Sequence, residues 1–330
     1  MVLGVTDLRD RERATRESHA IELATQLARR PYDLARPPLL RPHVFRLGAE
    51  SHLLLLAAHH FVTDGWSLGL LLHELSAIYE ARVSSRPVSL PELPIQYVDL
   101  VHWQRQQLNA GVLEEQLDYW VRKLRGAPAL LELQTDYPRP PAWSYHGANH
   151  TFVLEPELSD ALRSLSRHEG CTLFQTLLAA FQVLLHGYTG QDDMIVGTTV
   201  SNRNRQEAEQ VIGSFASSLV LRTDLSGDPA FRVLLERVRD VTWEAYAHQD
   251  LPFNRLVSAL QPERNTGHYL LYQVAILLHH RRGEQTLRLP GVVVQRVPVD
   301  LGTAQLDLCL ERVDAGPRLT GTIEYSTDLF

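Results

Sequence analysis

The chain has 330 residues, 44% of them hydrophobic and 22% charged, with a formal net charge of −7 and a pI of about 6.1. This length is more than one hydrophobic core usually serves, so two globular lobes are predicted. No basic tract stands out, which argues against nucleic acid as the main partner. Neither a signal peptide nor a membrane span is predicted, and Cys171 and Cys309 have no metal-type spacing. We expect a cytoplasmic protein without metal or membrane contact.

The first 140 residues predict mixed helices and strands. The strand at 52–60 is almost continuously apolar, which indicates burial on both faces. Asp64 and Gly65 break it. The predicted elements in chain order are a charged helix at 8–30, a strand hairpin turning at 48–50, a helix capped by Ser67, and helices at 97–108 and 113–124.

Residues 134–147, rich in proline and aromatics, predict a connector between lobes. A polar loop, "SNRNR", follows the strand at 193–200. We therefore predict an α+β fold with a first lobe at 1–140 and a second at 141–330. The elements predicted after the connector are strands at 150–154, 193–200, 214–225, 270–279, 290–298, 304–311 and 318–325, and helices at 156–168, 172–188 and 229–247.

Two adjacent histidines, His59 and His60, end the apolar strand at 52–60. Side chains alternate across a strand, so the two rings are expected on opposite faces, one packed and one exposed to chemistry. His60 is closer to the turn. Histidine suits general-base work because its unperturbed pKa is about 6.5. Asp64 lies in a tight turn beside a helix N-terminus, where it can orient a ring, pair with an arginine or accept backbone N–H groups.

Each part of this pattern also has a plain structural explanation. A lone histidine at a strand end is more often structural than catalytic, and Asp-Gly alone is usually a turn. The whole string His-His-x-x-x-Asp-Gly-Trp-Ser on an apolar strand leading into a helix is far more specific.

Six segments in order resemble condensation domains of nonribosomal peptide synthetases, which have the chloramphenicol-acetyltransferase-like fold. The resemblance covers essentially the whole chain. The segments are "HHFVTDGWS" (59–67), "YVDLVHWQ" (97–104), "DDMIVGTTVSNRNR" (192–205), "VIGSFASSLVLRTDLSGDPAFRVLLERVR" (211–239), "HQDLPFNRLV" (248–257) and "GTIEYSTDLF" (321–330).

This resemblance implies two chloramphenicol-acetyltransferase-like lobes forming a V, with a donor and an acceptor thioester arriving on phosphopantetheine arms of carrier domains. The acceptor amine attacks the donor thioester to form an amide. No bound cofactor is expected; the expected partners are the donor and acceptor carrier domains and neighbouring synthetase domains. By position His60 is the catalytic histidine, as proton acceptor or as a group that positions the amine. His59 and Asp64 are structural, and the Gly65 N–H is an oxyanion donor.

Further site candidates carry structural alternatives. Trp66 and Trp103 are expected mainly as packing residues, and Trp66 is kept as a tunnel candidate. "SNRNR" is either a solvated basic loop or part of the cleft floor, which makes Asn202 and Arg203 candidates. His248 is expected to end a helix, with a tunnel-facing role as the lesser alternative. Ser217 stands where the resembled family commonly has asparagine, and a serine offers a shorter side chain.

The chain also departs from the resembled pattern. The family normally opens with a segment ahead of this start, and an arginine from it usually pairs with the residue equivalent to Asp64. We therefore expect Asp64 to lack its partner, a costly state for a buried carboxylate, and an incomplete first lobe with exposed apolar surface. The family also usually continues into a last helix beyond residue 330.

Three functions follow as alternatives. The first is an amide-forming condensation domain. The second is an acyltransferase of the same fold that acts on a free amine or alcohol. The third is a non-catalytic recruitment or carrier-binding remnant. Epimerisation is weaker, because "GWSLGLLL" is more typical of condensation members, and heterocyclisation is disfavoured because that subfamily replaces the first histidine with aspartate.

Overall fold

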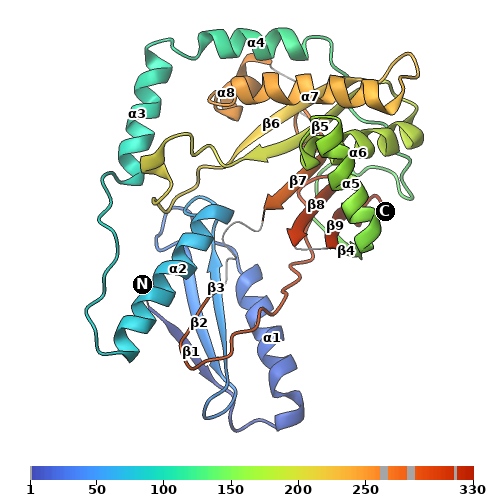
Figure 1. Ribbon diagram of the computed structural model, residues 1–330. Helices are drawn as coiled ribbons and strands as arrows, with labels where there is room; N and C mark the ends of the chain where they lie inside the picture. Colours follow the sequence, from blue (N-terminus) through green and yellow to red (C-terminus); the bar gives the residue numbers. More distant parts are fainter. Residues whose placement is uncertain (1, 261–266, 281–286, 316–317) are drawn as a thin grey trace. The chain divides into compact units, whose positions relative to one another are not determined.

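The structure is a computed structural model that describes residues 2–260, 267–280, 287–315 and 318–330. The chain divides into two compact units, whose helices and strands are labelled in Figure 1. Residues 102–140, expected with the first lobe, are in the second unit, and the first unit also takes in two later segments. The first unit comprises Met1–Val101, Arg203–Phe215 and Gly283–Leu301; the second comprises His102–Asn202, Ala216–Arg282 and Gly302–Phe330.

The first unit is built on a three-stranded sheet in the order β1-β2-β3. The predicted hairpin is confirmed, since β2 and β3 pair antiparallel, and β1 adds a parallel strand that was not predicted. A small core joins α1 to the sheet through Leu8, Ala20, Ala24 and Phe45. The elements are β1 (Gly4–Asp7), α1 (Arg13–Arg29), β2 (Leu40–Arg46), β3 (His52–Ala58) and α2 (Gly65–Val83).

The expectation that β3 is buried on both faces is wrong. No residue of the strand is fully buried, and Leu54 is 38% exposed. The reason is that the core under α1 covers one face of the strand, where Leu53 and Leu55 pack, and Leu54 points to the opposite face. The strand also ends at Ala58, two residues before the predicted end.

The second unit is built on a six-stranded mixed sheet in the order β4-β9-β8-β7-β5-β6. The pairs β5–β7 and β7–β8 are parallel, and β5–β6, β8–β9 and β4–β9 are antiparallel. Helix α3 (Tyr97–Asn109) runs across the division between the units. The other elements are α4 (Glu114–Leu124), β4 (Gly147–Val153), α5 (Pro156–His168), α6 (Leu173–Thr189), β5 (Asp193–Val200), a 3-10 turn at Gln206–Ala208 in the first unit, β6 (Ser217–Asp224), α7 (Phe231–Ala247), α8 (Phe253–Leu260), β7 (Val274–His280), β8 (Leu308–Ala315) and β9 (Arg318–Ser326).

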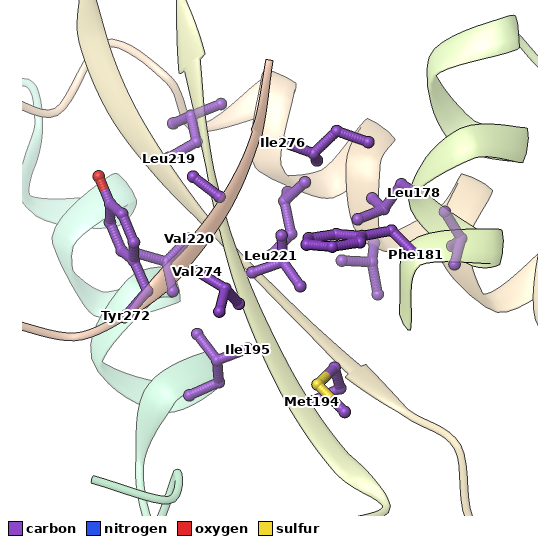
Figure 2. Close-up of a cluster of buried hydrophobic side chains, with 14 of the residues drawn as sticks. Leu178, Phe181, Met194, Ile195, Leu219, Val220, Leu221, Tyr272, Val274 and Ile276 are labelled. Carbon is purple, nitrogen blue, oxygen red and sulfur yellow. The ribbon is translucent and has the colours of Figure 1, made fainter. Parts of the chain in front are cut away.

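The core of the second unit lies between this sheet and its helices. Helix α6 begins with a capping box between Thr172 and Gln175 and ends at Gly190 in the left-handed conformation. Its apolar side packs against β5, β6 and β7, as Leu178, Phe181, Met194, Leu221 and Ile276 show (Figure 2). The mixed sheet with helices confirms the α+β class.

The strand predicted at 290–298 is wrong, because this part of the chain has no regular structure beyond a turn. Residues 134–146 lack regular strands and helices, as a connector should, yet they are not loose. Arg139 pairs with Asp307, whose side chain is fully buried.

Among the described residues, no single helix is both long and apolar enough to cross a membrane. Helices α5 and α6 pass that test only when taken together, and they meet at a bend of 108°.

Candidate active site

The histidine motif lies in the turn that connects β3 to α2. Asp64 is the N-cap of α2, because its Oδ1 accepts a hydrogen bond from the Ser67 backbone N–H at 2.8 Å. The prediction that Ser67 caps the helix is therefore wrong by three residues, and Gly65 is the first helical residue. The cap fixes how the turn at residues 60–62 enters the helix.

His59 is packed in the manner expected of a structural histidine. Its ring is half-buried and makes edge contacts with Tyr32 and Phe61, with ring centroids 5.7 and 4.9 Å apart. Its Nδ1 accepts a hydrogen bond from the Phe61 backbone N–H at 3.1 Å. His59 therefore stabilises the turn that its neighbour occupies.

His60 is exposed, and its Nδ1 lies 3.3 Å from the Ser214 Oγ. The two histidines thus have different environments, as expected, although not because of strand alternation. Both follow the end of β3 at Ala58, so the turn separates the rings. Ser214 was not a sequence candidate.

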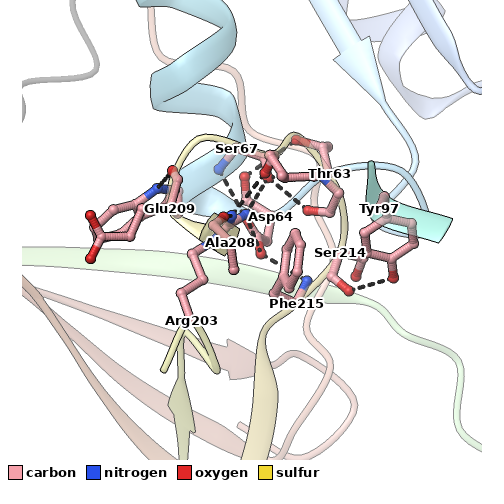
Figure 3. A network of polar contacts seen from close by, with 12 residues as sticks. Thr63, Asp64, Ser67, Tyr97, Arg203, Ala208, Glu209, Ser214 and Phe215 are labelled. Atoms are coloured by element: carbon pink, nitrogen blue, oxygen red, sulfur yellow. Dashed lines mark hydrogen bonds and ion pairs between the residues drawn. The ribbon is translucent and has the colours of Figure 1, made fainter. Parts of the chain in front are cut away.

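Asp64 is buried and paired, contrary to expectation. The Arg203 guanidinium lies 3.3 Å from Oδ1, and Oδ2 accepts the Phe215 backbone N–H at 2.9 Å (Figure 3). Burial raises the pKa of Asp64, but the N–H groups of Ser67 and Phe215 and the Arg203 charge more than offset it, so the pKa is lowered overall. The ion pair comes from the loop after β5, which the sequence reading did not connect with Asp64.

Arg203 is also not part of a solvated loop. Its side chain is 1% exposed, and its guanidinium donates to the Val211 carbonyl at 2.8 Å and to the Ser67 Oγ at 2.7 Å. It also lies over the Phe215 ring, 3.9 Å from the centroid. Burial lowers the pKa of Arg203, opposed by Asp64. Arg203 thus folds the segment Arg203–Phe215 against the start of α2.

Ser67 and Tyr97 hold the end of that segment. The Ser67 hydroxyl donates to the Gly213 carbonyl at 2.7 Å and accepts the Gly213 N–H at 3.0 Å. The Tyr97 hydroxyl donates to the Ser214 carbonyl at 2.8 Å (Figure 3). Burial first, and then the Asp64 charge, raises the pKa of Tyr97, so this hydroxyl remains a donor.

Trp66 contacts the same segment and is not a core residue. Its indole is 47% exposed, and Nε1–H donates to the Glu209 carbonyl at 2.8 Å. Trp103, also expected in packing, is 39% exposed.

The remaining candidates belong to the second unit. Asn202 has a left-handed backbone, with φ of 51°, and Ser217 begins β6. His248 follows α7 as predicted: its ring stacks on Tyr119 with centroids 3.7 Å apart, and its Nδ1 lies 2.7 Å from the Glu244 carbonyl. These contacts favour the structural reading of His248.

Sequence reasoning missed Ser214, Tyr97 and the hydroxyl of Ser67. All three lie in motifs that it quoted, but each acts through a contact distant in sequence. The sequence feature that could have pointed to them is Gly213. Because glycine has no Cβ, the backbone at residue 213 can lie close to the Tyr97 ring.

Comparisons with known proteins place the chain beside one family. The protein-family model described as "Condensation domain" matches residues 2–330 of this chain. A linear gramicidin synthase protein from Brevibacillus parabrevis is 46% identical over 335 residues, covering 99% of this chain and 4% of that protein. The chain thus spans a small part of the relatives it matches.

Solved structures match over the whole length. The X-domain from teicoplanin biosynthesis has a TM-score of 0.90 at 25% identity, covering 100% of this chain and 74% of that one. Its complex with OxyB matches with a TM-score of 0.87 at 24% identity, covering 100% and 72%. A four-domain nonribosomal peptide synthetase, holo-AB3403 bound to AMP and glycine, has a TM-score of 0.83 at 26% identity, covering 99% of this chain and 25% of that one.

Proposed function

Because the chain belongs to the condensation-domain family, we propose that it joins a donor acyl or peptidyl thioester to an acceptor aminoacyl thioester through an amide bond. Both substrates are delivered on the phosphopantetheine arms of carrier domains, so its partners are a donor carrier, an acceptor carrier and the neighbouring domains of a synthetase. The observation that supports this most directly is the exposed His60 on a turn anchored by buried Asp64 and Arg203. A rigid support of this kind is what a reacting side chain requires.

The reaction forms a C–N bond and breaks a C–S bond. The acceptor amine attacks the donor carbonyl, the tetrahedral intermediate collapses, and the donor phosphopantetheine leaves as a thiol. His60 acts on the acceptor amine, either by taking its proton or by holding it in line with the donor carbonyl through a hydrogen bond. The proton lost by the amine balances the proton gained by the departing thiolate.

Gly65 is proposed to stabilise the negative charge on the carbonyl oxygen. As the first residue of α2 it lies at a helix N-terminus, where backbone N–H groups and the helix dipole favour negative charge. Donors of this kind at an oxyanion commonly supply a large share of rate acceleration.

The remaining site proposals concern the substrate path. Trp66, Asn202, Arg203, Ser217 and His248 were the candidates. Arg203 is now best explained as the partner of Asp64, and the stacking of His248 favours a structural role. Trp66, Asn202 and Ser217 stay proposals for substrate contact, and a cytoplasmic location stays a prediction from the sequence.

A second function is favoured by one observation. The solved structure with a TM-score of 0.90 is an X-domain, and an X-domain is also known in complex with OxyB. By analogy of fold alone, the chain would then be a non-catalytic recruitment or carrier-binding domain and would leave the amide bonds unchanged.

A single-turnover assay separates these functions. Aminoacyl donor and acceptor carriers are mixed with the 330-residue chain and weighed by intact mass spectrometry. His60→Ala is run in parallel, together with His150→Ala, which replaces an exposed histidine on β4. We expect a dipeptidyl mass on the acceptor with wild type and His150→Ala, and little with His60→Ala.

The other outcomes identify the alternatives. Transfer to a free amine or alcohol, with no transfer to the acceptor carrier, would support an acyltransferase for small acceptors. Absence of transfer by a folded protein across several carrier pairs would support recruitment. Equal product from wild type and His60→Ala would remove His60 from the mechanism.

A further inference from the structure

His60 is exposed, and among the residues that the structure describes the Ser214 hydroxyl is the one hydrogen-bond partner found for its ring, at 3.3 Å from Nδ1. A histidine ring on an exposed turn has a broad, roughly two-fold torsional preference about χ2. Without a partner it would sample orientations in which Nε2 points away from substrate. A fixed contact at Nδ1 limits that freedom.

The backbone on either side of the Ser214 side chain is held by hydrogen bonds. Three consecutive residues are each anchored: Gly213 by both of its backbone groups to Ser67, Ser214 by its carbonyl to Tyr97, and Phe215 by its N–H to Asp64. These four bonds leave the Ser214 side chain little freedom except rotation of its own Oγ. The hydroxyl can therefore change its distance to the neighbouring ring only by rotation about χ1.

The chemistry of imidazole then relates the donor in this hydrogen bond to the state of the other ring nitrogen. A neutral ring carries one N–H, and the other nitrogen keeps a lone pair. If Nδ1–H donates to the Ser214 Oγ, Nε2 is left with the lone pair that an attacking amine needs. In enzymes with a catalytic histidine, a hydrogen bond at one ring nitrogen commonly sets the tautomer at the other.

We infer that Ser214 is a positioning residue, whose hydroxyl accepts a hydrogen bond from His60 Nδ1–H and so presents the unprotonated Nε2 to the acceptor amine. This inference rests on the proposed function of His60. The 3.3 Å separation is long for such a bond, and catalytic hydrogen bonds of this kind tighten when substrate binds. Ser214 acts through the ring and touches no reacting atom.

The test reads the tautomer directly, so it does not depend on turnover. The full chain is labelled with ¹⁵N in its histidine rings, the His60 signals are assigned by their loss in His60→Gln, and long-range ¹H–¹⁵N correlations report which nitrogen carries the proton. We expect Nδ1–H in wild type and in Ser214→Thr, which keeps the hydroxyl. In Ser214→Ala we expect a shift toward Nε2–H, and no change in Ser164→Ala, an exposed serine on α5.

The same proteins are then compared in the single-turnover assay. One net hydrogen bond corresponds to a loss of about two- to tenfold in the rate of amide formation for Ser214→Ala. The acceptor concentration giving half-maximal rate should be unchanged, and Ser214→Thr should recover most of the rate.

Three results would overturn the inference: Nε2–H in the wild type, a tautomer unaffected by Ser214→Ala, or a donor acyl mass on Ser214 itself, which would make this residue a nucleophile. If wild type makes no product but its tautomer depends on Ser214 as expected, the proposed amide-forming function fails while the positioning contact stands. If turnover depends on His60 but the tautomer is independent of Ser214, the positioning contact fails while the proposed amide-forming function stands.

Discussion

At the scale of single residues, the pair of Asp64 and Arg203 is the feature on which the histidine turn depends. Both side chains are almost fully buried, at 3% and 1% exposed. A buried carboxylate that loses its partner is left with an uncompensated charge, which costs about 3–5 kcal/mol. The pair also explains why a loop after β5 belongs to the same compact unit as α2.

We predict that Arg203→Ala lowers the free energy of unfolding by about 3–5 kcal/mol. Arg203→Lys should lower it by less, because lysine keeps the charge but cannot donate to Asp64, Ser67 and the Val211 carbonyl together. Urea unfolding measures the change, with Arg86→Ala, an exposed arginine, as the control. A loss for Arg203→Ala no greater than that for Arg86→Ala would contradict the structural role of the pair.

Lowering the pH should weaken the pair of Asp64 and Arg203, because the pKa of Asp64 is lowered in the folded protein. Its folded pKa lies below the ordinary value of 3.8. A group with a lowered folded pKa contributes stability above its unfolded pKa and loses it as pH falls through the folded value. We therefore expect the stability difference between wild type and Asp64→Asn to be constant near neutral pH and to shrink below pH 3.8.

Unfolding free energies of both proteins across the acid range give this difference. Asp7, Asp224 and Glu244 also have lowered pKa values, but they are present in both proteins and cancel. A difference that stays constant or grows as the pH falls below 3.8 would show that the charge of Asp64 does not stabilise the fold.

At the scale of elements, the close approach of α3 to the segment Arg203–Phe215 depends on one glycine. A Cβ at Gly213 would overlap the Tyr97 ring, whereas a Cβ at Gly187, on the exposed side of α6, would meet nothing within 4 Å. The same substitution should therefore have opposite effects at the two positions.

We predict that Gly213→Ala destabilises the protein by about 1–3 kcal/mol through overpacking. Gly187→Ala should stabilise it by about 0.5–1 kcal/mol, since alanine is the better helix former. Urea unfolding tests both. Replacing Tyr97 by leucine in the Gly213→Ala background should recover part of the loss, and no recovery would mean that the clash lies elsewhere.

The sequence predicts elements well where its signals are local. The bounds of α5 and β5 follow from Pro156 at the first helical position and from an apolar run between polar residues, and both match the structure. The failures come from tertiary context. β1 is too short to show a period, residues 290–298 are rich in valine without forming a strand, and the exposure of β3 depends on which of its faces the α1 core covers.

The candidate site divides in the same way. The different environments of His59 and His60 and the structural role of Asp64 could be expected from the motif. The partner of Asp64 could not, because Arg203 is 139 residues away and no local pattern joins them. Ser214 was hidden for the same reason, since its contact with His60 spans 154 residues.

At the scale of the whole molecule, the two units differ greatly in the core that supports them. Among the described residues, the buried apolar cluster of the first unit consists of Leu8, Ala20, Ala24 and Phe45, and Ala208 and Val211 are buried outside it. The second unit buries side chains from most of its helices and all its inner strands. Local stability follows buried apolar contacts, so the unit that carries the histidine turn should be the more easily opened.

We predict that backbone amides of β2 exchange with solvent faster than those of β5 and β8, measured by hydrogen exchange and mass spectrometry under native conditions. Phe45→Ala, at a side chain 1% exposed, should accelerate exchange in β2 and β3 and leave β5 and β8 unchanged. Leu178→Ala, at a fully buried side chain, should accelerate exchange in β5 and β6 and cost about 2–5 kcal/mol. Exchange that rises equally in both units for both variants would show that the chain opens as one cooperative body. In that case the small core around Phe45 would be stabilised by the rest of the molecule, and mutations far from His60 would lower the population of the folded histidine turn.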